Sequence, residues 1–236
     1  MIGRILALLL TSVTLLGNVI NYDFVADKFK LPEEAKVLVV VEGTGGTHCK
    51  VTAFEKEEGH FNAKLQVTGY LGRNGMSNYR TEGDGTTPIG IWRMDTPFGQ
   101  KPAQEGFPSN YIQVDESYVW ADDTNALVKD PTREGEKVGT ERYEGFYNYV
   151  INCGYNKAAY PKKGAALFLH CTYGDYTESS GCVEIPENAM VKIMKLYGKY
   201  GDGACFIAQA PKGKVSMLYN AFGVCSGLSP NGDFSK

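Results

Sequence analysis

The sequence has no C-x-x-C pair and only three histidines, His48, His60 and His170, which lie far apart along the chain. A structural zinc site with the usual Cys/His spacing is therefore not expected. An excess of basic residues is also missing, since 24 Lys and Arg stand against 27 Asp and Glu and the formal net charge is −3. Nucleic acid and anionic membrane surfaces need a basic face, so neither is expected as a partner.

Long runs with helical periodicity are few, and no internal repeat or low-complexity tract is found. Glycine is abundant with 28 residues, and there are 15 Tyr and 11 Phe, a balance typical of strands and turns. A chain of 236 residues is long enough for one large domain with its own core. These features favour a mainly β protein.

The N-terminal region contains a twelve-residue apolar run, residues 5–16, behind a single positive charge at Arg4. This run is shorter than a membrane span and fits the core of a signal peptide, although no A-x-A cleavage site follows it. We expect residues 1–25 to be a signal peptide, with an uncleaved membrane anchor or a buried core helix as alternatives. An exported protein, secreted or associated with the cell envelope, is the resulting expectation, and the leader is the only expected membrane contact.

Several segments have the period-two pattern or the short apolar runs of strands. The ranges 50–55 and 61–70 are predicted to form a hairpin. The other predicted strands are 36–42, 88–94, 111–114, 147–153, 165–170 and 203–208. Helical spacing is clear only over 186–200, where Met190, Ile193, Met194 and Tyr197 recur on one face. The sequence thus predicts an antiparallel or mixed β-sandwich with one or two helices packed on one side.

Three segments are predicted as irregular. Residues 71–87 and 95–110 are rich in Gly, Asn, Pro and charge and are expected to be loops that build a cleft. Residues 115–145 are polar and are expected to run over the surface, and 211–236 is expected to be a C-terminal extension.

The segment 164–186, GAALFLHCTYGDYTESSGCVEIP, carries the strongest chemical signal. His170 closes an apolar strand, and Cys182 follows a Ser-Ser-Gly turn twelve residues later. A thiol attacks a carbonyl only as the thiolate, and a nearby imidazole is well suited to remove its proton. We expect Cys182 to be the nucleophile and His170 the base.

Neighbouring residues have expected supporting roles. Gly181 and Cys182 are expected to direct backbone N–H groups at the developing oxyanion, and Ser180 to orient the imidazole through its carbonyl or its hydroxyl. Ser179 and Tyr173 are the candidates for substrate contact. The alternative interpretation is structural, because a buried Cys is often a small hydrophobe and a His at the end of a strand is often a core residue.

The remaining cysteines are interpreted as structural. Alternation along the strand places Cys171 on the face opposite His170, so packing or a disulfide is expected there. An even count of six cysteines in an exported protein suggests disulfides, but with Cys182 free at most two can form. Cys205 and Cys225 are one candidate pair, and the sequence does not fix the connectivity.

These residues resemble the catalytic domain of the L,D-transpeptidases of the YkuD type. That family's signature is a His, a spacer and Ser-His-Gly-Cys, and the run Thr87-Pro88-Ile89-Gly90 resembles its Thr-Pro-x-Gly strand entry. The resemblance covers roughly residues 36–210 and is strongest to a divergent branch with Gly-Cys-Val-x-Ile-Pro, here 181–186. It implies a β-sandwich, Cys182 as nucleophile, His170 as base and Gly181 as the glycine of the oxyanion turn.

The sequence departs from the family at three places, one of which is a shorter spacer after His170. Ser180 stands where the motif has its histidine, and Glu184 stands where many members have an arginine two residues past the Cys. That arginine would have met a substrate carboxylate or polarised the site, which Glu184 does not do.

The resemblance implies an L,D-transpeptidase that acts on peptidoglycan stem peptides through a thioester and needs no metal or organic cofactor. Such an enzyme belongs to cell-wall biogenesis and the maintenance of cell shape. An L,D-carboxypeptidase would use the same site with water as acceptor, and a non-catalytic wall-binding domain would keep the fold alone.

Overall fold

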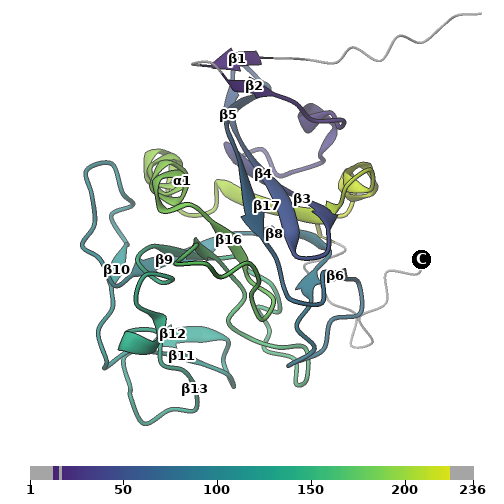
Figure 1. Cartoon of the computed structure of the whole chain (residues 1–236). Coiled ribbons are helices and arrows are strands. Elements are labelled where there is room, and N and C mark those ends of the chain that lie inside the picture. Colours follow the sequence, from purple (N-terminus) through teal and green to yellow (C-terminus); the bar gives the residue numbers. More distant parts are fainter. Residues whose placement is uncertain (1–12, 16–17, 224–236) are drawn as a thin grey trace, which may run out of the picture.

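The structure is a computed structural model that describes residues 13–15 and 18–223 (Figure 1). Its centre is a ten-stranded mixed sheet. In spatial order the strands are β10 (Ile112–Gln113), β9 (Asp95–Gly99), β14 (Val150–Asn152), β15 (Phe168–Cys171), β16 (Val183–Ile185), β5 (His60–Tyr70), β4 (His48–Glu57), β3 (Val37–Gly45), β17 (Cys205–Pro211) and β8 (Gly90–Arg93).

Three small sheets and a few helices complete the fold. The small sheets are β1 (Val13–Leu15) with β2 (Asn18–Ile20), β6 (Met76–Ser77) with β7 (Thr87–Pro88), and β11 (Val119–Ala121) between β12 (Ala126–Val128) and β13 (Gly135–Glu136). The only α-helix of the described residues is α1 (Glu187–Tyr200), and short 3₁₀ turns lie at Ala26–Lys28, Glu141–Tyr143 and Val215–Leu218.

The large sheet folds over at the junction of β5 and β16. These two strands share a single pair, Glu184 with Tyr70, and a Cβ on Gly69 would come within 2.2 Å of the Glu184 carbonyl oxygen. Only a glycine allows the two backbones to cross this closely. The crossing divides the sheet into one half with β3, β4, β17 and β8 and another with β9, β14, β15 and β16.

The two halves enclose a shared core with α1. Inward-facing residues of the first half, such as Val39 and Ile207, lie in the same buried cluster as Leu169 and Ile185 of the second half. The helix adds its apolar face, which consists of Ala189, Met190, Ile193, Met194 and Tyr197. The prediction of a mainly β sandwich with a helix packed on one side is confirmed, and the helix begins directly after Pro186 as expected.

Each half has a second, outward face that another part of the chain covers. The outer face of the first half, including Phe54 and Phe206, packs against Phe24 and Phe29 and against the turn after β17. The outer face of the second half, including Phe98 and Phe168, packs against Trp120 and Val138 of the segment that carries β11 to β13. In Figure 1 that segment lies at the opposite end of the molecule from β1 and β2.

The predicted strands are confirmed with shifted ends, and the hairpin turns at Glu58 and Gly59, both with positive φ. The predicted loop 95–110 was wrong at its start, because β9 occupies Asp95–Gly99. The loop 71–87 likewise contains β6. Such short pieces become strands only by pairing with distant partners, here β14 and β7 respectively.

The prediction that 115–145 only runs over the surface was also wrong. Its strand β11 is fully buried, with Trp120 at 0% exposure, and it forms the cover of an outer sheet face. The polar composition concealed this, because a single Trp flanked by Val and Ala supplies the anchor.

Most of the apolar run 5–16 lies outside the described residues. Ile20 and Phe24, which fall within the range 1–25, are buried against the outer face of the first half. Among the described residues no helix is both long and apolar enough to cross a membrane.

Candidate active site

Parallel pairing of β15 and β16 brings His170 and Cys182 together. His170 lies opposite Glu184, and Cys182 comes two residues before Glu184. Side chains two residues apart share one face of a strand, so both side chains leave the sheet on the same side. This offset corresponds to a Cα separation of about 8 Å, from strand spacing and rise per residue. His170 and Cys182 line one cavity of about 590 Å³.

The imidazole of His170 is held by backbone oxygen. Its Nδ1 lies 3.0 Å from the carbonyl oxygen of Cys171. A carbonyl only accepts, so Nδ1 carries the hydrogen and Nε2 presents its lone pair. Burial lowers the pKa of His170 to about 4. The carbonyls of Cys171 and Phe146 have the opposite, smaller effect on this pKa. At neutral pH the ring is therefore neutral and able to accept a proton at Nε2.

Cys182 is 8% exposed and packs in the same buried cluster as Phe168, on the outer face of the second half of the sheet. Its Sγ accepts a hydrogen bond from the Phe168 N–H and donates one to the Ala166 carbonyl, each at 3.4 Å. Burial raises the pKa of Cys182 well above the usual range for a thiol. In this state the side chain is a neutral thiol, so a thiolate forms only when a base takes the proton.

The Ser-Ser-Gly turn has a different internal arrangement from the one expected. The Gly181 N–H donates to Ser179 Oγ at 3.0 Å, and Ser179 Oγ donates to the Cys182 carbonyl at 2.7 Å. The Gly181 N–H is thus engaged within the turn, which corrects its predicted oxyanion role for this state. An oxyanion role for the Cys182 N–H stays a prediction.

In the structure Ser180 does not hold His170 Nδ1, and its orienting role stays a prediction. Ser180 Oγ accepts a hydrogen bond from Arg73 Nη1 at 3.1 Å, while the Cys171 carbonyl holds His170. The residue directly after the histidine reaches Nδ1 because the strand ends there. No local sequence signal marks a carbonyl for this role.

Of the two predicted substrate contacts, Ser179 lines the cavity and Tyr173 packs beside it. Tyr173 is 51% exposed, and its ring lies 5.5 Å from that of Phe146. Tyr176, which the sequence did not single out, lines the cavity and packs on Phe146 at 5.2 Å. Phe146 in turn packs edge-on to His170 at 6.3 Å.

The loop 71–87 forms one wall of the cavity, as expected of a cleft loop. It pairs with the Ser-Ser-Gly turn, since the Arg73 N–H donates to the Ser179 carbonyl at 2.9 Å and the Ser179 N–H donates to the Leu71 carbonyl at 2.9 Å. Thr87 fixes the loop by accepting from the Gly72 N–H at 2.9 Å. The second predicted cleft loop, 95–110, does not contribute, and its place is taken by residues 136–147.

Charged residues that sequence reasoning missed surround the pair. The cavity is lined by Arg73, Arg80, Arg142 and Glu136. Burial raises the pKa of Glu136 to about 7, and Glu136 accepts a hydrogen bond from the Tyr147 hydroxyl. Arg73 and Arg80 come from the loop 71–87, and Glu136 and Arg142 come from β13 and the 3₁₀ turn after it. None of them belongs to a motif, so only the fold identifies them.

Glu184 stands where many members of the resembled family have an arginine, and it is 2% exposed. Its Oε1 lies 3.9 Å from His170 Nε2, and its Oε2 has no hydrogen-bond partner among the described residues. Burial raises the pKa of Glu184 to about 7. Burial therefore favours the neutral form of this carboxyl beside the imidazole.

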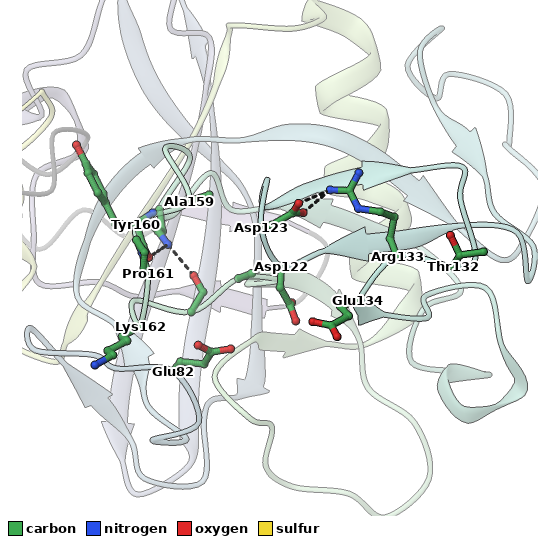
Figure 2. Close-up of a pocket in the computed structure, with 13 residues that line it drawn as sticks. Glu82, Asp122, Asp123, Thr132, Arg133, Glu134, Ala159, Tyr160, Pro161 and Lys162 are labelled. Carbon is green, nitrogen blue, oxygen red and sulfur yellow. Dashed lines mark hydrogen bonds and ion pairs between the residues drawn. The ribbon is translucent and has the colours of Figure 1, made fainter.

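A second cavity of about 720 Å³ adjoins the first at Ala165 and is acidic (Figure 2). Figure 2 shows Glu82, Asp122 and Glu134 around it, with Arg133 paired to Asp123. Burial raises the pKa of Asp122, with further contributions from Glu82 and Glu134. Over residues 13–15 and 18–223, no group of three His, Cys, Asp or Glu side chains is arranged to hold a metal ion.

The described cysteines are all free and buried, namely Cys49, Cys153, Cys171, Cys182 and Cys205. Cys171 lies in the core between the two sheet halves, on the face opposite His170, as alternation predicts. Cys225 lies outside the described residues, and with it the candidate pair with Cys205.

No family model and no curated protein matches the chain. Among solved structures the chain is similar to the Bdellovibrio bacteriovorus protein Bd1075, with 14% identity and a TM-score of 0.40. The likeness covers 74% of this chain and 47% of that protein, so the chain spans about half of its length. At this level of likeness no activity is transferred to the chain.

Proposed function

We propose that this chain is a cysteine-dependent L,D-transpeptidase that acts on the stem peptides of peptidoglycan through a thioester. The supporting observation is a neutral imidazole whose Nδ1 is held by the Cys171 carbonyl, in the same cavity as the Cys182 thiol. Acyl transfer requires a nucleophile and a base that can approach each other, and this cavity contains one of each. The stem-peptide substrate comes from the resemblance of the segment 164–186 and of Thr87–Gly90 to the family.

The chemistry begins with a neutral thiol. As Cys182 Sγ attacks the carbonyl that precedes the terminal D-amino acid, His170 Nε2 takes the thiol proton. The C–N bond then breaks, the imidazolium returns the proton to the leaving amine, and a thioester remains. The amine of a second stem peptide attacks the thioester, His170 takes the surplus proton, and Cys182 Sγ leaves to recover it.

His170 has a lowered pKa and Cys182 a raised pKa, so both side chains are neutral before the reaction. A stable thiolate–imidazolium pair is disfavoured because both side chains are buried, so proton transfer accompanies attack instead of preceding it. Bound substrate would displace the thiol from its contact with Ala166 and turn it toward His170.

The test is the intact mass of the purified protein after incubation with a disaccharide tetrapeptide. We expect an adduct equal to the donor minus the terminal D-amino acid, mapped to Cys182 and absent from Cys182→Ala. An adduct on another residue, or none under turnover conditions, contradicts the proposal.

Two related activities share this site and give other products. Water as acceptor makes an L,D-carboxypeptidase, which releases tripeptide and free D-amino acid without cross-linked dimers. A non-catalytic wall-binding domain would bind the tetrapeptide and return it unchanged. Product analysis of the same incubation separates the three.

A further inference from the structure

Arg80 is a buried cation whose hydrogen bonding is incomplete. The side chain is 5% exposed, and its Nη1 donates to the Thr86 carbonyl and lies 3.4 Å from Asp84 Oδ1. Its Nε has no hydrogen-bond partner among the described residues. A buried charged donor without an acceptor carries a desolvation penalty, so a native structure that keeps one calls for an explanation.

Two glycines make room for this guanidinium. A Cβ on Gly181 would come within 2.4 Å of Arg80 Nη1, and a Cβ on Gly164 within 3.3 Å of its Nε and Nη2. Both glycines have a positive φ, 138° and 89°. The cation therefore lies between the backbone before Cys182 and the backbone that leads to Ala166, whose carbonyl binds the Cys182 thiol.

The Arg80 guanidinium lies at the cavity that contains Cys182 and influences the Cys182 thiol. Arg80 lines that cavity together with Arg73 and Arg142, and its charge favours the Cys182 thiolate. The nearest carboxylate, Asp84, is already engaged by the N–H groups of Thr81 and Thr86 at 2.7 and 2.8 Å. Asp84 thus meets Arg80 only at Nη1, and the rest of the guanidinium has no acidic partner among the described residues.

We propose that Arg80 binds the free terminal carboxylate of the acyl donor and so takes the place of the arginine missing two residues past Cys182. A carboxylate accepts strong, charge-assisted hydrogen bonds from a guanidinium, and a carboxylate at the part of Arg80 that lines the cavity would balance its buried charge. This inference rests on the proposed function for the identity of the ligand, a peptide ending in a D-amino acid.

The test measures binding and not turnover, so that it does not depend on catalysis. In the Cys182→Ala background, calorimetry compares a tetrapeptide with a free C-terminal carboxylate and the same peptide with a C-terminal amide. We expect the free acid to bind about 10- to 100-fold more tightly, as a lost charge-assisted hydrogen bond predicts. Adding Arg80→Gln should remove this preference by weakening the acid alone, and Arg80→Lys should restore part of it.

Arg93→Gln is the matched control, because Arg93 lies on β8 and pairs with Glu34 at 2.6 Å, away from the cavity. It should leave the preference unchanged. Equal affinity of Cys182→Ala for acid and amide overturns the proposal even if Arg80→Gln does not fold, as does an equal loss for both peptides in a folded Arg80→Gln. If the preference is present but wild type forms no thioester, the carboxylate site stands and the proposed catalysis fails.

Discussion

Strands β15 and β16 have two faces that differ in chemistry although they share the same backbone. The inner face presents Leu169, Cys171, Val183 and Ile185 to the core with α1, and all are buried and apolar. The outer face packs Phe168 in a hydrophobic cluster and presents His170, Cys182 and Glu184 to the cavity. There the pKa values of the titratable groups are shifted and Glu184 lacks a partner.

This difference shows how period-two alternation separates stability from chemistry. One short segment builds the core with every second residue and the candidate site with the others. Substitutions on the inner face should therefore change stability, and those on the outer face should change reactivity.

The largest expected effect is on the two cysteines. Cys182→Ala should reduce turnover to background with a cooperative melt retained, since the nucleophile is lost. Cys171→Ala should keep turnover and lower the free energy of unfolding by about 1–2 kcal/mol, because it leaves a small cavity in the core. Turnover and thermal melts are measured for both variants. Turnover by Cys182→Ala would show that the nucleophile is not on the outer face.

His170→Gln should slow acylation by about 10²- to 10⁴-fold, the usual contribution of a general base. Gln keeps a donor for the Cys171 carbonyl, so folding should be retained. Single-turnover thioester formation measures the effect. His60→Gln is the control, because His60 is exposed and pairs with Asp27 on the other half of the sheet. Acylation within a few-fold of wild type would remove His170 from the mechanism.

Glu184→Gln should stabilise the protein at high pH. Burial raises the pKa of Glu184 from 4.5 to about 7, so its stability contribution is complete below 4.5 and is lost as pH rises through 7. At pH 8 the variant should exceed wild type by up to about 3 kcal/mol, and near pH 5 the difference should be small. Denaturant unfolding at the two pH values is the measurement, and a gain that does not depend on pH would show that ionisation is not the cause.

Gly181→Ala should disturb the outer face alone. The new Cβ would meet Arg80, and the φ of 138° is unfavourable for alanine, so a loss of about 1–3 kcal/mol and weaker peptide binding are expected. Gly46→Ala has a positive φ of 55° with no atom within 4 Å of the new Cβ, so it tests strain without a clash. Equal peptide binding by both variants would argue against a role for the Arg80 position.

Sequence reasoning was most successful where the information is local. The hairpin of β4 and β5, the helix after Pro186 and the opposite facing of His170 and Cys171 all follow from periodicity over a few residues. It failed at β9, because this short strand pairs with β14, more than 50 residues away, and at β11, because polar flanks surround its short buried sequence.

The sequence by itself determined the mainly β sandwich and singled out His170 and Cys182 as the candidate base and nucleophile. Alternation, turn residues and residue type can all be recognised over a short segment of sequence. Only the tertiary structure decided that the Cys171 carbonyl holds the imidazole and that Arg80 lies against Gly181. It also buried Glu184 beside His170. These contacts depend on how the sheet crosses itself at Gly69 and on which loop closes over its outer face, and both are set by packing between segments distant in sequence.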